Sequence, residues 1–182
     1  MKLNTYLALF RGINVGGKNI LPMKDLLELV TQLGVQKART YIQSGNLVFD
    51  AKPADCATIE QQIRLAIKAR FGFEPAIILI GAKQLAQIIE ASPFSSTEEQ
   101  AQSAHFGFLS KPATQADMQK LEKMCKESER FVLTEQVFYL FAPEGLGQSK
   151  LAAGAEKALG VQTTFRNFRT VLKLGEMVSN RV

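Results

Sequence analysis

The residue types best suited to hold an anion are concentrated in a glycine-rich segment, GINVGGKN, at positions 12–19. Its spacing fits the G-x4-G-K pattern of phosphate-cradling loops, but Asn19 stands where the Ser or Thr that binds magnesium should be. In such loops the helix begins at the lysine, whereas Pro22 predicts a helix start several residues later. We therefore do not predict a P-loop NTPase. The glycines fit a loop that presents backbone amides to an anion, and equally a tight crossover from strand to helix. The candidate ligand-binding residues here are Arg11, Asn14, Gly16, Gly17 and Lys18.

Three further polar segments could contribute to a ligand site. At a predicted hairpin turn, ordinary turn chemistry explains the Ser-Gly-Asn sequence, and ligand binding is the alternative. A predicted helix opens with a serine and a lysine, which would favour an anion at its N-terminus, although capping also explains the serine. The segment TTFRNFRTVLK at positions 163–173 mixes basic and aromatic residues, which can stack on bases or form an amphipathic terminal helix. The candidates in these segments are Gln43, Ser44, Asn46, Ser149, Lys150, Asn167 and Thr170.

No catalytic residue can be assigned from the sequence. His105 lies in a predicted strand between aromatic residues, a setting more typical of a structural histidine than of a general base. The chain has one His and two Cys, which are too few for a four-ligand zinc site. We therefore expect no metal and no cofactor, and the catalytic residues remain unknown.

Composition and charge narrow the class of protein. The 182 residues are 46% hydrophobic and 21% charged, which is ordinary for a globular protein and excludes a disordered chain. The net charge is +5, and residues 1–24 carry four bases and no acid. Residues 145–182 are also basic, while residues 92–144 are acidic, so a positive surface would form if the two ends met. We find no apolar run long enough for a membrane span and no signal peptide, and expect a cytoplasmic protein.

Hydrophobic periodicity predicts the order β-α-β-β-α-β twice along the chain. We therefore expect an α+β protein of two ferredoxin-like halves, a topological duplication in one chain. The first half, residues 1–80, contains a strand at 3–10, a helix from Pro22 to Gly34, two strands within 37–50, a helix at 55–71 and a strand at 76–80. A linker at 81–103 contains a short helix and a polar loop at 92–103. The second half, residues 104–182, contains strands at 104–110, within 130–142 and at 161–165, helices at 115–127 and 149–159, and a C-terminal helix from about Asn167.

Several of these segments together resemble a known bacterial family. The opening YLALFRGINVGGKNILPMKDL, the hairpin RTYIQSGNLVF and the motif TFRNFRTVLKL are similar to domain-of-unknown-function family 1697 over essentially the whole chain. The resemblance implies a cytoplasmic α+β protein and no assigned activity. Similar members usually have Trp where this chain has Phe168, which weakens the case for base stacking there. The family's shared polar positions coincide with the candidate residues above other than Lys18, which favours a ligand site without identifying the ligand.

These observations lead to one functional hypothesis and two alternatives. We expect a binding module in which the polar loops of both halves line one basic cleft for a phosphate-bearing ligand, a nucleotide or RNA. One alternative is an enzyme acting on a small anionic metabolite, with Ser44, His105 or Lys150 as chemical groups. The other is an interaction domain that dimerises through a sheet edge, and the sequence leaves both monomer and homodimer open.

Overall fold

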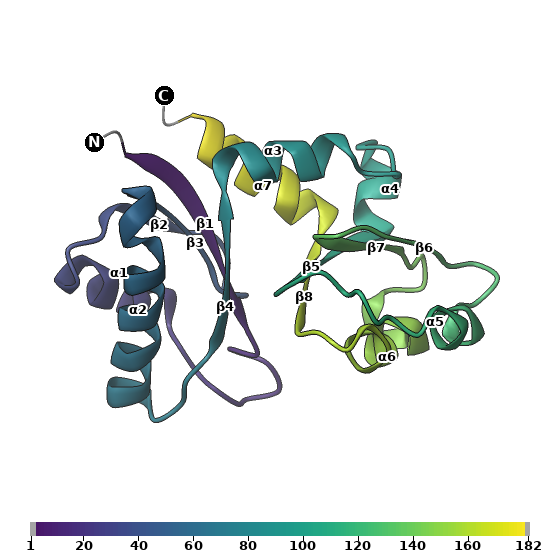
Figure 1. Cartoon of the computed structure of the whole chain (residues 1–182), viewed down its shortest axis with the longest axis horizontal. Helices are drawn as coiled ribbons and strands as arrows, with labels where there is room; N and C mark the ends of the chain where they lie inside the picture. Colours follow the sequence, from purple (N-terminus) through teal and green to yellow (C-terminus); the bar gives the residue numbers. More distant parts are fainter. Residues whose placement is uncertain (1–2, 181–182) are drawn as a thin grey trace. The chain divides into compact units, whose positions relative to one another are not determined.

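The computed structural model describes residues 3–180, apart from one side chain at position 99, and divides them into two compact units (Figure 1). Unit 1 comprises residues 3–86 and 174–180, and unit 2 comprises residues 87–173. The chain passes from one unit to the other inside α3 (Ala82–Glu90) and again inside α7 (Phe168–Ser179). The sequence analysis instead places the boundaries at residues 80 and 104, because composition changes in the polar linker and not within a helix.

Unit 1 has the predicted order of elements. Apolar periodicity and helix-ending glycines define them well, and Gly72 ends the second helix in the left-handed conformation (φ 78°) that glycine adopts without strain. The four strands form one antiparallel sheet in the order β2-β3-β1-β4. The elements are β1 (Asn4–Arg11), α1 (Met23–Gln32), β2 (Gln36–Thr40), β3 (Asn46–Ala51), α2 (Cys56–Phe71) and β4 (Ala76–Gly81).

The core of unit 1 lies between this sheet and two helices. Phe10 and Phe49, on neighbouring strands, pack with Leu26 of α1 and Ile63 of α2 in one buried cluster. Figure 1 shows α1 and α2 on the same face of the sheet. Because side chains alternate along a strand, Leu9 lies on the opposite face, and it is also fully buried. Both faces of the sheet are therefore closed to solvent at the centre of β1.

Unit 2 repeats the strand arrangement, with an antiparallel sheet in the order β6-β7-β5-β8. Two predicted boundaries are wrong. The predicted polar loop at 92–103 contains a short helix, α4. The predicted helix at 115–127 begins later, because the Asp117 side chain caps it by accepting a hydrogen bond from Lys120 N–H, and it ends earlier, at Met124. The elements are α4 (Glu98–Ser103), β5 (Ala104–Leu109), α5 (Met118–Met124), β6 (Arg130–Leu133), β7 (Val137–Phe141), α6 (Lys150–Leu159) and β8 (Thr163–Asn167).

Aromatic side chains close the face of the second sheet that lies away from α5 and α6. Phe106 stacks on Phe168 with ring centroids 4.6 Å apart and meets Tyr139 edge-on at 4.9 Å. The Tyr139 hydroxyl donates a hydrogen bond of 2.8 Å to the Ile88 carbonyl of α3, and burial raises its pKa to about 12. Phe168 is therefore part of the core, which confirms the amphipathic-helix interpretation of its segment and leaves no ring face for a base.

The described part of the chain is thus an α+β protein with two four-stranded antiparallel sheets. Within residues 3–180, no helix combines the length and apolar character that crossing a membrane requires.

Candidate functional site

The glycine-rich segment after β1 folds into a very tight hairpin. Lys18 N–H donates to the Val15 carbonyl at 3.0 Å, and Asn14 N–H donates to the Asn19 carbonyl at 3.1 Å. Gly16 and Gly17 occupy the two central turn positions with φ of 57° and 73°, the geometry of a type I′ turn, which favours glycine at both. The helix α1 begins only at Met23, so this segment lacks the helix N-terminus that a P-loop places at its lysine.

A second loop, the β2–β3 turn at residues 41–46, lies directly beside this hairpin. The Asn14 side-chain amide donates to the carbonyls of Leu21 at 2.9 Å and Gln43 at 2.8 Å. Its oxygen accepts a hydrogen bond of 2.8 Å from Leu21 N–H. One asparagine therefore ties the two loops together, and we call residues 11–20 and 41–46 the loop platform.

Gly45 brings the backbones of the two loops close together. Phe10 N–H donates to the Gly45 carbonyl at 2.9 Å. A Cβ added at Gly45 would lie 2.6 Å from Cδ1 of Ile13, and the residue has φ of 78°. Glycine is required at this position both by the left-handed conformation and by the close approach.

Asn46 is wholly buried under the platform. Its side-chain amide donates to the Tyr41 carbonyl at 2.9 Å and to Ser44 Oγ at 3.0 Å. The amide hydrogens of both Asn14 and Asn46 are therefore used within the fold, where they hold the loops in one conformation. Of the predicted residues in unit 1, Lys18, Gln43, Gly16 and Gly17 are the ones exposed to solvent.

The loop platform also exposes apolar side chains that the sequence analysis missed. Val15, Ile20 and Ile42 have 67%, 55% and 49% of their surface exposed. In a sequence, aliphatic letters next to strands and helices are typical of core positions. The signal that could have identified them is their place inside turn segments, between glycine and asparagine residues.

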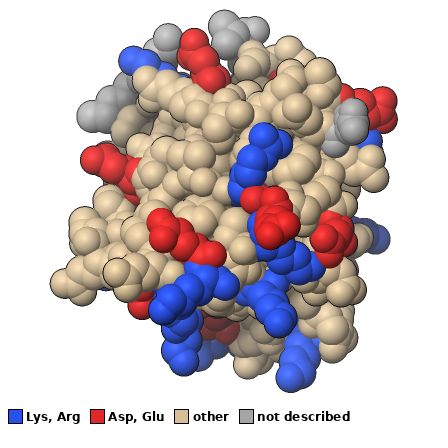
Figure 2. All heavy atoms as spheres, turned by 90° about the vertical axis from the view of Figure 1, so that its right-hand side faces the viewer, with Lys and Arg blue, Asp and Glu red and all other residues tan. Residues whose placement is uncertain are grey.

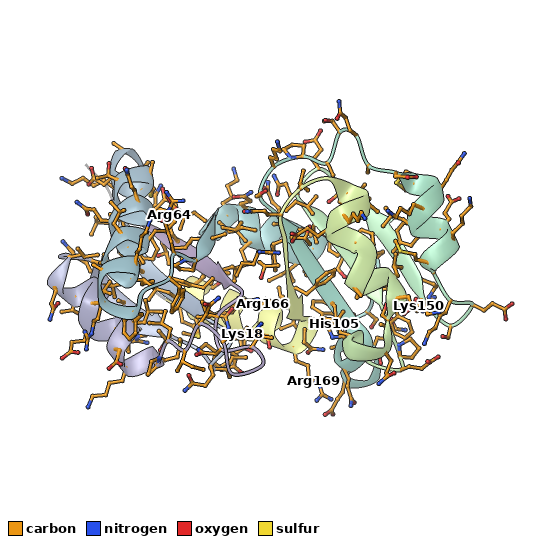
Figure 3. The ribbon with its side chains drawn as sticks, turned by 90° about the horizontal axis from the view of Figure 1, so that it is seen from below. Lys18, Arg64, His105, Lys150, Arg166 and Arg169 are labelled. Atoms are coloured by element: carbon orange, nitrogen blue, oxygen red, sulfur yellow. The ribbon has the colours of Figure 1, made fainter. Side chains whose placement is uncertain are left out.

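Charge distinguishes the loop platform from the rest of unit 1. The cations of α2 are paired with acids: Arg64 Nε lies 3.0 Å from Glu60, and Lys68 Nζ lies 3.0 Å from Glu74 and lowers the pKa of that carboxyl. The platform itself contains no Asp or Glu, and Lys18 makes no ion pair within residues 3–180. Figure 3 shows Lys18 on the loop after β1 and Arg64 on α2, well apart from each other.

In unit 2 the predicted residues fall at one end of the second sheet. Ser149 is buried and caps α6 by accepting a hydrogen bond of 3.0 Å from Ala152 N–H, while Lys150 is exposed at the first helical position. Asn167 donates to the Gln102 carbonyl at 2.7 Å and accepts from Arg169 N–H at 3.0 Å. Thr170 is half-buried in the first turn of α7. Ser149 and Asn167 thus have local structural roles, and Lys150 is the exposed cation (Figure 3).

Besides Tyr139, the ionisable side chains of His105 and Arg166 are buried in the second sheet. His105 is 9% exposed, its Nδ1 lies 3.1 Å from the Ser103 carbonyl, and burial lowers its pKa. Arg166 is 7% exposed and donates to the Phe165 carbonyl at 2.8 Å and to Thr164 Oγ1 at 3.0 Å. Burial lowers the pKa of Arg166 to about 10, so it stays charged at neutral pH.

The outer surface of unit 2 carries charges of both signs. Figure 2 shows Lys and Arg gathered in the lower part of this face with Asp and Glu among them. The Lys126 ammonium, for example, donates a 2.6 Å hydrogen bond to Glu144 and lowers the pKa of that carboxyl. The mixture agrees with the acidic balance of residues 92–144.

The two pockets of unit 2 do not involve the predicted site residues, and the described side chains form no metal site. Two shallow pockets of about 330 and 460 Å³ lie within unit 2, the first beside Tyr139 and the second beside Gly160. Neither is lined by a predicted site residue. No group of three His, Cys, Asp or Glu side chains within residues 3–180 could hold a metal ion. The structure therefore brings together the predicted residues of unit 1, while one cleft lined from both halves stays a prediction.

Comparison with known proteins gives a family and a fold. The model of the family described as "Protein of unknown function (DUF1697)" matches residues 3–139. No curated protein matches the chain. A solved structure of a conserved bacterial protein from Streptococcus pneumoniae matches with a TM-score of 0.68 and 22% sequence identity, covering 97% of this chain and 99% of that one. At this identity the likeness concerns the fold alone.

Proposed function

This chain belongs to the DUF1697 family, and from the geometry of its loop platform we propose that it is a binding module for a phosphate-bearing ligand, a nucleotide or RNA. The proposal is carried by the hydrogen-bond donors of the loop platform that have no acceptor in the described chain. Lys18 is exposed without an ion pair in the described chain, and the N–H groups of Gly16 and Gly17 beside it have no acceptor among the described residues.

Such a group of donors suits an anion for two reasons. Neighbouring main-chain N–H groups in a tight turn form a concave anion site, and a lysine adds a full charge. The hydrogen bonds of Asn14 fix the loops before a ligand arrives, so binding loses little conformational entropy. No carboxylate in the platform opposes the anion.

We also propose that each unit is ferredoxin-like. The same order of elements and the same relative strand order, second-third-first-fourth, in both units support this assignment. Sheets of this kind often bind RNA on their open face. In unit 1 three side chains of that face, Leu7, Leu9 and Val48, are fully buried. In unit 1 we therefore expect the ligand to contact the loop platform at the end of the sheet.

The alternatives have less support. An enzyme for a small metabolite, with Ser44, His105 or Lys150 as chemical groups, stays a prediction, and the two pockets described in unit 2 contain none of these residues. A dimer through a sheet edge stays a prediction, which light scattering of the purified chain would test.

A salt-titrated binding assay on the full chain tests the proposal. The probes are a fluorescent single-stranded RNA of about 12 nucleotides and a set of nucleotides. Lys18→Ala should weaken binding at low salt and reduce the dependence of log affinity on log salt by about one unit. Lys68→Ala removes the same charge from an ion-paired position on α2 and is the matched control. Equal loss in both variants, or no binding of any probe at low salt, would overturn the proposal.

A further inference from the structure

The exposed apolar side chains of the loop platform are grouped around one residue. Asn14 is the chain neighbour of Val15, and its two acceptors, Leu21 and Gln43, are the chain neighbours of Ile20 and Ile42. The hydrogen bonds of Asn14 therefore fix the backbone next to three exposed aliphatic residues. Single exposed aliphatic residues are common on protein surfaces, whereas a rigid group of them marks a contact surface.

Ile42 combines an unfavourable backbone conformation with an exposed apolar side chain. It has φ of 49°, a left-handed conformation that is unfavourable for a β-branched residue, and about half of its surface is exposed. Its neighbour Tyr41 is held on both sides, since Tyr41 N–H donates to the Asn46 carbonyl and the Tyr41 carbonyl accepts from the Asn46 side chain. A strained and exposed apolar residue in a locked turn is a typical feature of a binding site.

Tyr41 adds a half-buried aromatic ring next to Ile42. We call Val15, Ile20, Tyr41 and Ile42 the apolar rim. The rim lies in the same two loops as the cation and the free glycine amides, with an exposed amide side chain at Gln43. A partner for this surface must carry negative charge and unburied apolar faces together.

We propose that the apolar rim contacts the bases of a single-stranded RNA whose phosphates lie on Lys18 and the Gly16–Gly17 turn. The inference rests on the proposed function and names its ligand class. A single strand offers phosphates and unpaired base faces at a short repeat, whereas a duplex hides its base faces. A mononucleotide offers a single base, whereas the apolar rim has four side chains in two loops. The absence of any acid in both loops favours a polyanion over a protein surface of mixed charge.

Ile42→Asn is the decisive variant, because asparagine tolerates the left-handed conformation and removes the apolar contact. Its affinity for the single-stranded RNA should fall about five- to tenfold, the lower end of the loss for one base stacked on an aromatic ring, because isoleucine has no ring, with an unchanged salt slope. Binding of a duplex RNA of the same length should not change. Leu65→Asn is the matched control, since Leu65 is 51% exposed on α2 of the same unit. Val15→Ser, at a turn position that is 67% exposed, is the second variant if Ile42→Asn does not fold.

The outcomes separate this inference from the proposed function. If Lys18→Ala weakens RNA binding and neither rim variant does, the phosphate site stands and base contact is wrong. Equal loss of single-stranded and duplex binding in Ile42→Asn would also overturn base contact. If no RNA or nucleotide binds, and the rim variants instead abolish binding of a protein partner, both proposals fall. Selective loss of single-stranded binding supports the inference.

Discussion

The side-chain amide of Asn14 lies 2.8 Å from the carbonyl oxygen of Gln43, a residue 29 positions further along the chain. This contact follows from strand pairing. In the antiparallel pair of β1 and β3, Leu9 lies opposite Asn46, so the end of β1 and the start of β3 are neighbours. The loop after β1 and the turn before β3 must then share one end of the sheet, and Asn14 fills the space between their backbones.

We predict that Asn14→Ala destabilises unit 1. The variant loses two donated hydrogen bonds and one accepted bond, and it leaves the Leu21 N–H without its partner. The free energy of unfolding should fall by about 1–3 kcal/mol in urea denaturation. Asn19→Ala is the control, because its exposed side chain makes one hydrogen bond, to the Gly12 carbonyl. Equal stability of the two variants would show that the loops are held by other contacts.

Gly45 and Gly16 should respond differently to alanine, although both have positive φ. At Gly16 a Cβ meets nothing within 4 Å, so Gly16→Ala should lose only the conformational cost, about 1–2 kcal/mol. At Gly45 the Cβ would also lie 2.8 Å from Cβ of Phe10, and overpacking should raise the loss to about 2–4 kcal/mol. Thermal unfolding of both variants measures the difference. A smaller loss at Gly45 than at Gly16 would contradict the close approach.

The elements of both units could be predicted from the sequence because their signals are local. The stripe of Leu26, Val30 and Leu33 and the left-handed Gly72 and Gly160 determine helix faces and ends within one or two turns of chain. The sequence analysis missed α4 because this helix has no apolar pattern. Helix α4 is six residues long and polar, so it lacks the apolar period that distinguishes a helix from a loop.

The candidate site could be predicted only in part. Polar residues in turns predicted two loops of unit 1 that the structure brings side by side, but not the role of each residue. Asn14 and Asn46 face inward and hold the loops, while Val15, Ile20 and Ile42 face solvent. Exposure depends on which strands pair, and the pairing of β1 with β3 joins residues some forty positions apart. Local patterns contain no information about it.

We predict that Tyr139→Phe destabilises unit 2 by about 1–2 kcal/mol, because the Ile88 carbonyl loses its buried donor. The ring itself should keep its edge-on contact with Phe106, since phenylalanine has nearly the same shape. Guanidinium denaturation measures the loss, and an unchanged near-ultraviolet circular dichroism spectrum would show that the aromatic packing is kept. A variant as stable as the parent would mean that water satisfies the carbonyl.

His105 should make the stability of the protein depend on pH in a defined window. Burial lowers the pKa of this imidazole below its ordinary 6.5, so as pH falls the unfolded chain takes up a proton that the folded chain does not. The stabilisation is therefore fully present above pH 6.5 and is lost as pH falls toward the folded pKa, with a slope of up to about 1.4 kcal/mol per pH unit.

Urea denaturation between about pH 5.5 and 7.5 avoids most carboxylate titration, and His105 is the one histidine of the chain. His105→Gln should flatten the profile. Parallel profiles for the parent and the variant would show that this histidine is already accessible to protons in the folded state.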